Sequence, residues 1–332
     1  MKEVLKRNLE LGTAKLPFNP GVVAFFSKDQ MLMCEMTGNI SNYMDLFVSE
    51  ESHNNEYSKL FRLTDRIGYR ETDKIFGALL GSKALIQKYQ PVFNQKINSH
   101  ESYVYLGINF KQVPFIKVES TTINNYFYMG PFRSRFFLHD IIDIMLEEFE
   151  SPACPGPDFP CKLLALKKCP GYCINNKSNL SDNLLNNYLL PQEDRLNILL
   201  EKKEKQLTDL QFNKAQTTKL HWSNLKKFYA RISFLMVTKD ISHKFEYKGK
   251  RIKIKNGLLE QVGNRKFNNV IRKYQSNELY AVDKSELNER WVIYNELKAL
   301  IPRELMAGYN KSRKELMKYM EEKGKENVGE NN

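Results

Sequence analysis

Four of the five cysteines of this chain lie in one stretch of twenty residues, with the spacing C-x6-C-x7-C-x3-C. They are Cys154, Cys161, Cys169 and Cys173. The segment from Ser151 to Cys173 also holds five prolines, at Pro152, Pro155, Pro157, Pro160 and Pro170. Proline removes a backbone donor and fixes φ, so neither a continuous helix nor a central strand can cross this segment. Because backbone hydrogen bonds cannot fix its shape, we expect a metal or cluster held by the four thiolates.

The spacing by itself leaves several interpretations of these cysteines open. Disulfides are disfavoured, because the charged N-terminus has no apolar stretch typical of a secretory signal and intracellular thiols are usually kept reduced. Structural zinc usually takes its ligands in two close pairs, and only Cys169 and Cys173 approach that spacing. An iron–sulfur cluster takes four thiolates from irregular loops. Four unliganded buried thiols are the remaining alternative, and the spacing does not rank iron–sulfur above zinc.

The balance of charge favours a polyanionic partner. The chain has 332 residues, enough for two or three small domains, and a net charge of +12 with a pI near 9.2. Nucleic acid is the commonest polyanion bound by such proteins, although many basic proteins have no such role. No run of about eighteen apolar residues is present, so no membrane span is expected. With no secretory signal, the sequence predicts a cytoplasmic protein.

The residues that precede the cysteines favour one interpretation through a resemblance. Gly130-Pro131-Phe132-Arg133-Ser134 is followed by a helix-like segment and then by Pro160-Cys161, Cys169 and Cys173. This order resembles the region after the nuclease domain in the UvrC family of nucleotide-excision repair proteins, which includes the shorter Cho homologues. In that family a G-P-F/Y-x-S segment leads into a helix and then into a loop ending P-C-x7-C-x3-C. The resemblance implies a [4Fe–4S] cluster on the four cysteines, with zinc as the alternative.

Residues 1–98 resemble the GIY-YIG nuclease domain that opens the UvrC and Cho proteins. Pro20-Gly21-Val22 with Phe25 matches the family's P-G-V-Y-x-F strand. The run from Ala78 to Asn94 follows the family's A-L-L-L-E-x-x-L-I-K-x-x-Q-P-x-x-N pattern. Hydrophobic periodicity agrees, and predicts a short helix over 1–11, strands over 20–26 and 30–36, and helices over 40–47 and 76–89.

The chemistry of such a domain needs polar residues that this chain lacks. In the family a tyrosine acts on the attacking water beside a second tyrosine, an arginine stabilises the phosphate charge, and a glutamate holds the divalent metal. The corresponding positions here are Val23, Met33, Tyr43 and Ser82. A neutral serine cannot replace a carboxylate as a Mg²⁺ anchor, and the spacing of Glu35, Asp45 and Glu71 does not mark them as substitutes. We therefore predict a retained fold with no catalytic residues.

A helical segment after the cysteines resembles a partner-docking motif. The run from Leu207 to Ala215 is similar to the core of the UVR motif, L-E-F-E-x-A-A, and keeps Leu210, Phe212 and Ala215. The acidic residues of the motif are replaced by Gln211 and Asn213. The resemblance implies that a helical hairpin over 200–230 docks a partner repair subunit, while a plain helical hairpin is the alternative.

Basic residues in three places are candidates for contact with DNA phosphates. Two flank the start of the helix after Gly130-Pro131, three lie between the cysteines, and three lie on a predicted strand meander over 245–262. In chain order they are Arg133, Arg135, Lys162, Lys167, Lys168, Lys250, Arg251 and Lys253. A solvated charged surface is the alternative for each group.

The sequence as a whole predicts an α+β protein. The predicted regions are a degenerate GIY-YIG-like domain over 1–98, a strand platform with the cysteine cluster over 99–190, a UVR-like hairpin over 191–240, a basic α+β tail over 241–323 and a disordered end over 324–332. The predicted function is a repair protein that binds double-stranded DNA, including damaged DNA, without incising it. An active Mg²⁺-dependent endonuclease and a protein-interaction scaffold with a structural metal site are the alternatives. The length leaves no room for the C-terminal nuclease half of UvrC.

Overall fold

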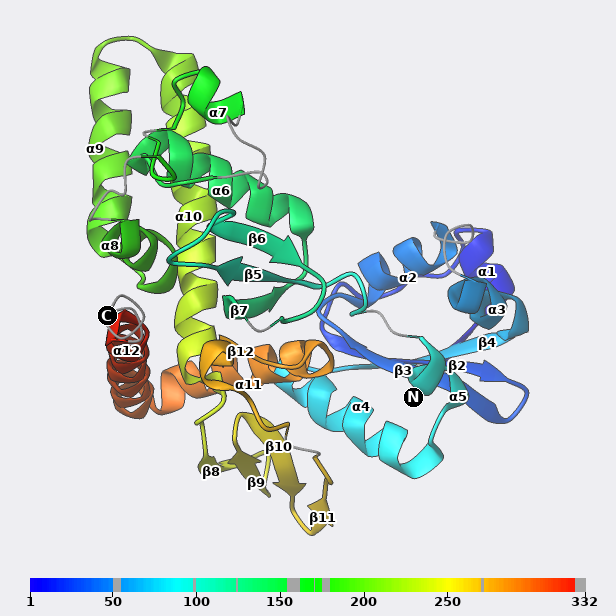
Figure 1. Ribbon diagram of the computed structural model, residues 1–332. Coiled ribbons are helices and arrows are strands. Elements are labelled where there is room, and N and C mark those ends of the chain that lie inside the picture. The colour runs from blue at the N-terminus through cyan, green and yellow to red at the C-terminus, as the bar shows by residue number, and fades with distance from the viewer. Residues whose placement is uncertain are drawn as a thin grey trace. The chain divides into compact units, whose positions relative to one another are not determined.

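The computed structural model describes residues 1–49, 55–97, 100–123, 125–153, 162–169, 171–174, 180–269 and 272–325. The chain forms two compact units, Met1–Ser99 with Val262–Arg265, and His100–Gln261 with Lys266–Asn332. Each unit combines helices with sheet (Figure 1), which confirms the predicted α+β class. No helix in the described ranges is long and apolar enough to cross a membrane.

The first unit is built on one sheet with helices on both of its faces. Its elements are β1 (Lys2–Leu5), α1 (Lys6–Glu10), β2 (Gly21–Ser27), β3 (Gln30–Thr37), α2 (Ile40–Ser49), α3 (Asn55–Leu63), β4 (Arg66–Glu71), α4 (Ile75–Tyr89) and α5 (Val92–Lys96). The strand order is β1-β4-β2-β3, and each neighbouring pair is antiparallel. The predicted strands over 20–26 and 30–36 and the helices over 40–47 and 76–89 are confirmed to within two residues.

The first residues of the chain differ from their prediction. The sequence predicts a helix over 1–11, but Lys2–Leu5 form a strand and only Lys6–Glu10 are helical. Strand β1 pairs with β4 at the edge of the sheet, and Lys2 Nζ lies 3.0 Å from Glu71 Oε1. The prediction is wrong because the partner strand lies far along the chain, and such pairing overrides local helix propensity.

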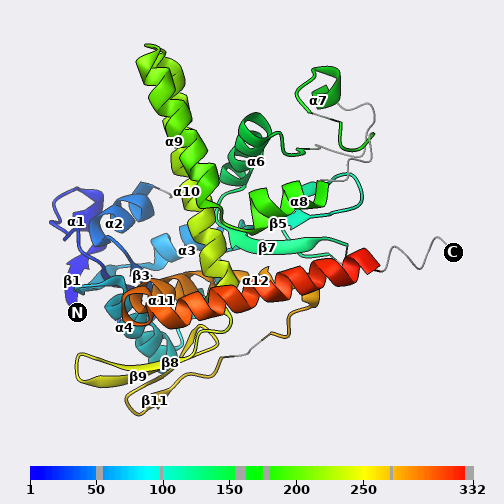
Figure 2. The ribbon, with the colours of Figure 1, turned by 90° about the vertical axis from the view of Figure 1, so that its left-hand side faces the viewer.

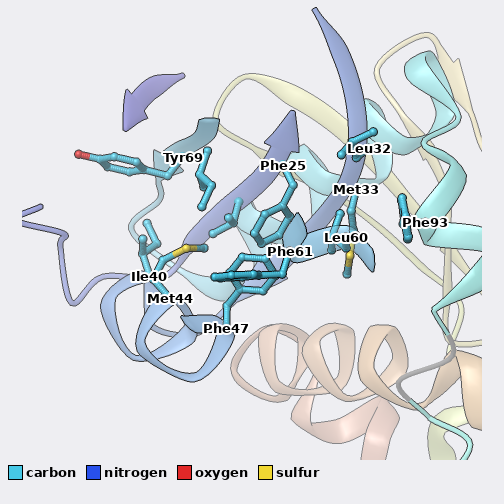
Figure 3. Close-up of a cluster of buried hydrophobic side chains, with 12 residues drawn as sticks. Phe25, Leu32, Met33, Ile40, Met44, Phe47, Leu60, Phe61, Tyr69 and Phe93 are labelled. Atoms are coloured by element: carbon cyan, nitrogen blue, oxygen red, sulfur yellow. The ribbon is translucent and has the colours of Figure 1, made fainter. Parts of the chain in front are cut away.

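Strand β2 lies inside this sheet and is buried on both faces. Val22, Val23, Ala24 and Phe25 are all completely buried. Because neighbouring side chains of a strand point to opposite faces, Val23 and Phe25 pack with α2 and α3, whereas Val22 and Ala24 pack with α4. Figure 3 shows the first of these clusters, in which the rings of Phe25 and Phe47 have centroids 4.4 Å apart.

The second unit contains two four-stranded sheets and the remaining helices. Its elements are β5 (Val104–Ile108), β6 (Ile116–Glu119), β7 (Phe127–Phe132), α6 (Arg135–Phe149), α7 (Lys162–Ala165), α8 (Leu180–Leu184), η1 (Leu185–Leu189), α9 (Glu193–Thr208), α10 (Phe212–Thr238), β8 (His243–Tyr247), β9 (Lys250–Lys255), β10 (Leu258–Val262), β11 (Arg265–Lys266), η2 (Ser276–Glu278), β12 (Tyr280–Ala281), η3 (Lys284–Glu286), α11 (Leu287–Leu300) and α12 (Pro302–Lys325). One sheet has the order β12-β7-β5-β6 and the other β11-β10-β9-β8.

Helix α10 is the long element around which the second unit packs. It has 27 residues, and α9 runs beside its first half as a helical hairpin (Figure 1), which Figure 2 shows from the side of α9. Its later residues Phe228, Ile232 and Leu235 are completely buried. Helices α6, α11 and α12 all pack against it. The hairpin of α9 and α10 corresponds to the helical segment that the sequence predicts over 191–240.

The C-terminal residues complete the sheet that begins after residue 100. Strand β12 pairs in parallel with β7, with Tyr280 opposite Met129. The Tyr105 hydroxyl donates a hydrogen bond to the Val282 carbonyl oxygen at 2.9 Å. The regions predicted as a platform, a hairpin and a tail therefore share one compact unit. The predicted disordered end over 324–332 falls outside the described residues, apart from the last two residues of α12.

A buried arginine joins the second sheet of this unit to the helices. Arg290 on α11 is 2% exposed. Its Nη1 donates to the carbonyl oxygens of Thr238 and Asn256 at 3.1 and 2.7 Å, and its Nε and Nη2 donate to Glu286 Oε2 at 3.0 and 2.8 Å. Gly257 has φ +74°, and a Cβ there would overlap the Thr238 carbonyl. This arrangement holds the end of α10 against the turn between β9 and β10.

Candidate functional site

The positions of the family's two tyrosines are occupied here by core residues. Val23 on β2 and Met33 on β3 belong to the apolar cluster beneath α2 and α3. Val23 is completely buried and Met33 is 3% exposed. Figure 3 shows Met33 among the apolar side chains of this cluster. Neither side chain can hydrogen-bond a water, so this face of the sheet serves as core at both positions.

A carboxyl–phenol pair lies on the same face of the sheet. Glu35 is opposite Val23 in the β2–β3 register, so both side chains point to one side. The Tyr43 hydroxyl donates to Glu35 Oε2 at 2.6 Å. Burial raises the pKa of the Glu35 carboxyl, and the hydrogen bond from Tyr43 lowers it by a smaller amount. A carboxyl whose neutral form is favoured is a weak ligand for a hard cation.

The fourth predicted position, Ser82, lies on α4, the helix that packs on the other face of the sheet. Ser82 is buried on α4, where its Oγ donates to the Leu79 carbonyl oxygen at 3.1 Å. The α4 residue Ala78 packs on the face opposite Val23 and Met33. The structure therefore gathers Val23, Met33 and Tyr43 in one cluster and leaves Ser82 with the other face.

The carboxylates considered as substitutes do not form a metal site in the structure. Glu71 is engaged by Lys2 Nζ and Asn19 Nδ2, each at 3.0 Å, and Asp45 is exposed on α2. Within the described ranges, no three His, Cys, Asp or Glu side chains are grouped so that they could hold a metal ion. The described carboxylates thus give no support to a Mg²⁺ centre.

The Glu35 carboxyl leads to a prediction about stability and pH. Because its pKa is raised in the folded state, the first unit loses stability as the pH rises from near 4.5 through the folded pKa. Substitution E35Q keeps an acceptor for Tyr43 and removes the titration, so we expect the variant to be more stable than the natural protein at pH 8. The buried thiol of Cys34 reports unfolding of this unit through its labelling rate in moderate urea, normalised to the fully unfolded chain. If the stability of the first unit depended on pH in the same way in E35Q and in the natural protein, the raised pKa of Glu35 would be contradicted.

One asparagine connects the two ends of the cysteine segment. Ser151 Oγ donates to Asn183 Oδ1 at 2.7 Å, and Asn183 Nδ2 donates to the Tyr172 hydroxyl at 3.1 Å. Ser151 lies three residues before Cys154, and Tyr172 lies directly before Cys173. The network therefore brings the start and the end of the segment together. Sequence reasoning missed Asn183, because a single polar residue in a short helix belongs to no motif.

Two of the four predicted cluster cysteines lie within the described residues. Cys169 is buried, and the Gly171 N–H donates to its Sγ at 3.5 Å. Cys173, four residues later, is half-buried. Cys154 and Cys161 lie outside the described residues. Hydrogen bonds to cysteine sulfur are common at thiolate ligands of iron–sulfur clusters, so the described half of the segment has chemistry that fits such a ligand.

Two of the predicted DNA contacts flank the start of α6. Ser134 caps this helix, with its Oγ accepting a hydrogen bond from a backbone N–H in the first turn. Arg133 and Arg135 on either side of it are exposed. Arg133 Nη2 donates to Asn288 Oδ1 at 2.6 Å, and Arg135 Nη1 donates to the Val118 carbonyl oxygen at 2.8 Å. Both of these partners are neutral, so neither hydrogen bond offsets the charge of its arginine.

The other predicted contacts lie around α7 and on β9. Exposed side chains there are Lys162, Lys167, Lys168, Lys250 and Arg251. Lys253 differs, because its Nζ lies 2.6 Å from Glu260 Oε2 and its charge is partly offset. A side chain must be exposed to solvent to contact a DNA phosphate. For all eight residues, contact with DNA stays a prediction.

Comparisons with known proteins identify relatives of this chain. UvrABC system protein C from Thermotoga petrophila is 24% identical over 183 residues, which are 53% of this chain and 31% of that protein. The protein of the same name from Mycoplasma mycoides is 25% identical over 249 residues, which are 70% of this chain and 41% of that protein. The chain is therefore similar to UvrC proteins over 53% to 70% of its length. No protein-family profile matches it.

Solved structures of one UvrC domain are also similar to this chain. The magnesium-bound GIY-YIG N-terminal endonuclease domain of UvrC from Thermotoga maritima covers 28% of this chain and 99% of that domain, at 21% identity and a TM-score of 0.24. A match with that TM-score adds nothing to the sequence relationship. The chain spans about a third of the length of the Thermotoga relative, so the activity of the whole UvrC proteins does not carry over to it directly.

Proposed function

We propose that this chain is a UvrC-like nucleotide-excision repair protein that binds DNA and does not cut it. The observation that carries the proposal is the closed apolar core at Val23 and Met33, where the family's chemistry needs hydroxyl groups. The net charge of +12 suits a polyanionic partner. A domain that keeps its apolar framework without its reacting groups can still position DNA.

An active Mg²⁺-dependent endonuclease is the alternative that this site disfavours. Such an enzyme would have to recruit Glu35, Asp45 or Glu71 as metal ligands. Glu35 accepts the Tyr43 hydroxyl in a setting that favours its neutral form. Glu71 already holds Lys2 and Asn19. Metal binding at Glu35 or Glu71 would therefore have to disrupt an existing pair before any cutting could occur.

We also propose that Cys154, Cys161, Cys169 and Cys173 hold a [4Fe–4S] cluster, with zinc as the alternative. The buried Sγ of Cys169 and its N–H donor suit a thiolate ligand. The Asn183 network brings the ends of the segment together, as a single cluster would require. A bound cluster would cross-link a segment in which prolines prevent regular backbone pairing.

A second proposed role is partner docking at the tip of the α9–α10 hairpin. Leu210 and Phe212 lie at this tip and are 72% and 61% exposed, while Ala215 is buried. Exposed apolar side chains gathered at one place often mark protein interaction sites. The name of the relatives, UvrABC system protein C, points to the A and B subunits of that system as the partners to test. If the protein were instead an interaction scaffold that does not bind DNA, it would dock its partner at the same tip.

One gel experiment tests the proposals on DNA binding, the absence of cutting and partner docking together. Anaerobically purified full-length protein is mixed with end-labelled duplex DNA that carries a bulky lesion, in the presence of Mg²⁺ or Mn²⁺. A native gel measures binding and a denaturing gel measures nicking. We expect a shifted band without a nick, and a weaker shift as salt rises, because phosphate contacts release counterions. Purified A and B subunits are expected to retard the band further.

Each other outcome of this experiment contradicts a named part of the proposal. A nick that a chelator abolishes would show that the domain cuts and would overturn the assignment of Val23, Met33, Tyr43 and Ser82 as inactive positions. Binding of the subunits without any DNA shift would favour the scaffold. A DNA shift that the subunits leave unchanged would refute docking at the hairpin tip.

A further inference from the structure

We propose that Arg231 and Arg133 form a binding site for a phosphate group of the DNA backbone, which rests on the DNA binding proposed above. Arg231 lies on α10, and Arg133 lies between β7 and α6. The rings of Phe132 and Phe228 stack with centroids 5.9 Å apart. Phe132 directly precedes Arg133. Phe228 lies about one helical turn before Arg231, so the ring stack brings both arginines to the same place.

Helix α11 supplies the rest of the proposed site. Arg133 Nη2 donates to Asn288 Oδ1 at 2.6 Å, and Asn288 Nδ2 donates to the Tyr103 hydroxyl at 3.4 Å. About one turn further along α11, the Trp291 ring lies against the Arg231 guanidinium, with 4.0 Å between Cζ and the ring centroid. Residues from three separate parts of the second unit therefore hold the two arginines close together.

Arg231 has no anionic partner within the described structure. A guanidinium carries five N–H donors, yet Arg231 donates no hydrogen bond to any described residue, and its Nη1 is buried. Burial and the neighbouring Arg133 lower the pKa of Arg231 to about 10, and Tyr103 is the group that opposes them. The two arginines therefore repel each other unless an anion lies with them.

The contrast with Arg290 shows how this fold satisfies a buried guanidinium when no ligand is needed. Arg290 donates to a carboxylate and to two carbonyl oxygens. Arg231 instead contacts aromatic rings, and an unpaired charge in such a place is unfavourable. A phosphate oxygen pair matches the planar donor fork of arginine. An anion of this kind would relieve the repulsion and satisfy the free donors together.

The test combines DNA binding with a fluorescence reporter. Substitution W222F leaves Trp291 as the remaining tryptophan of the chain. We expect duplex DNA to change the Trp291 fluorescence of W222F in a saturable way, and R231Q in that background to abolish the change. In salt titrations, R231Q and R133Q are each expected to weaken DNA binding about ten-fold and to lower the slope of log affinity against log salt by about one.

Substitution K226Q is the matched control for R231Q. Lys226 lies on the same helix and also stacks on a tryptophan, with its Nζ 4.7 Å from the Trp222 ring centroid. We expect K226Q to keep most of the affinity. Equal losses in R231Q and K226Q would mean that net charge alone is responsible, and would overturn the site. R231Q removes an unpaired charge, so its thermal midpoint is expected to be at least that of the natural protein; if it does not fold, exposed Arg133 provides the test through R133Q.

Two further outcomes separate this site from the proposed function. DNA binding that neither R231Q nor R133Q weakens would overturn the site and leave the proposed function standing. If the natural protein binds no DNA, the proposed function fails, and inorganic phosphate becomes the probe. A saturable Trp291 change with phosphate that R231Q abolishes would uphold a phosphate site with a different source of ligand, whereas no change would overturn the site as well.

Discussion

Replacing Cys169 by alanine is expected to abolish the visible absorption of the protein and to destabilise its second unit by about 4 kcal/mol or more. Cys169 is buried, and the Gly171 N–H donates to its sulfur. The described residues of this proline-rich segment, 151–153, 162–169 and 171–173, form no strand, so a cluster would provide much of their order. The absorption spectrum, the iron and sulfide content, and urea unfolding measure the effect. Tryptophan fluorescence reports on this unit, since Trp222 and Trp291 both lie in it.

Substitution C34A is the control for this prediction. Cys34 is also completely buried, but it lies on β3 of the first unit and outside the predicted ligand set. We expect C34A to keep the full absorption and the unfolding midpoint of the second unit. An unchanged spectrum and midpoint in C169A would refute the ligand assignment. A colourless natural protein with one zinc per chain would support zinc in place of the cluster, and a protein with neither metal would support buried thiols.

Replacing Arg290 by methionine is expected to lower the free energy of unfolding of the second unit by about 3–5 kcal/mol. The substitution leaves Glu286, 15% exposed, without its paired donors and leaves the Thr238 and Asn256 carbonyls without Nη1. Methionine has a similar apolar length, so the loss of hydrogen bonds dominates over the loss of volume. Urea unfolding followed by tryptophan fluorescence measures the change.

Substitution K311M provides the matched comparison for Arg290. Lys311 Nζ lies 2.6 Å from Asp240 Oδ2 in the same unit, but the two side chains are 59% and 53% exposed. Water screens such a pair, so we expect K311M to change the free energy of unfolding by less than about 1 kcal/mol. Similar effects of R290M and K311M would show that the buried network adds nothing beyond a surface ion pair.

Local patterns in the sequence predicted much of the first unit correctly. The apolar run through Val22 and Phe25 predicts a strand, because a short strand buried on both faces is apolar at consecutive positions. The start of α6 is equally local, since Ser134 caps the turn that follows it. The strand formed by Lys2–Leu5 was not predicted, because its hydrogen bonds come from β4, which lies far along the chain.

The candidate sites show the same difference between features that are local in the sequence and features that depend on distant residues. The cysteine spacing and the resemblance named four ligands, and a single motif contained all of them. Asn183 and Arg231 were missed, since each acts through residues distant in the chain: Asn183 through Ser151, and Arg231 through Arg133 and Trp291. A helical arginine in a basic chain looks like any other until its neighbours are known.

The sequence by itself determined which residues stand at the family's catalytic positions and where the cysteines lie, because residue identity and spacing are properties of the chain. Only the tertiary structure decided that Val23 and Met33 are sealed in an apolar core, that Glu35 accepts a hydrogen bond from Tyr43, and that Arg231 has no counter-charge among the described residues. Burial and pairing depend on which distant segments pack together. The free energy of a charged or polar side chain depends on those neighbours more than on its own identity.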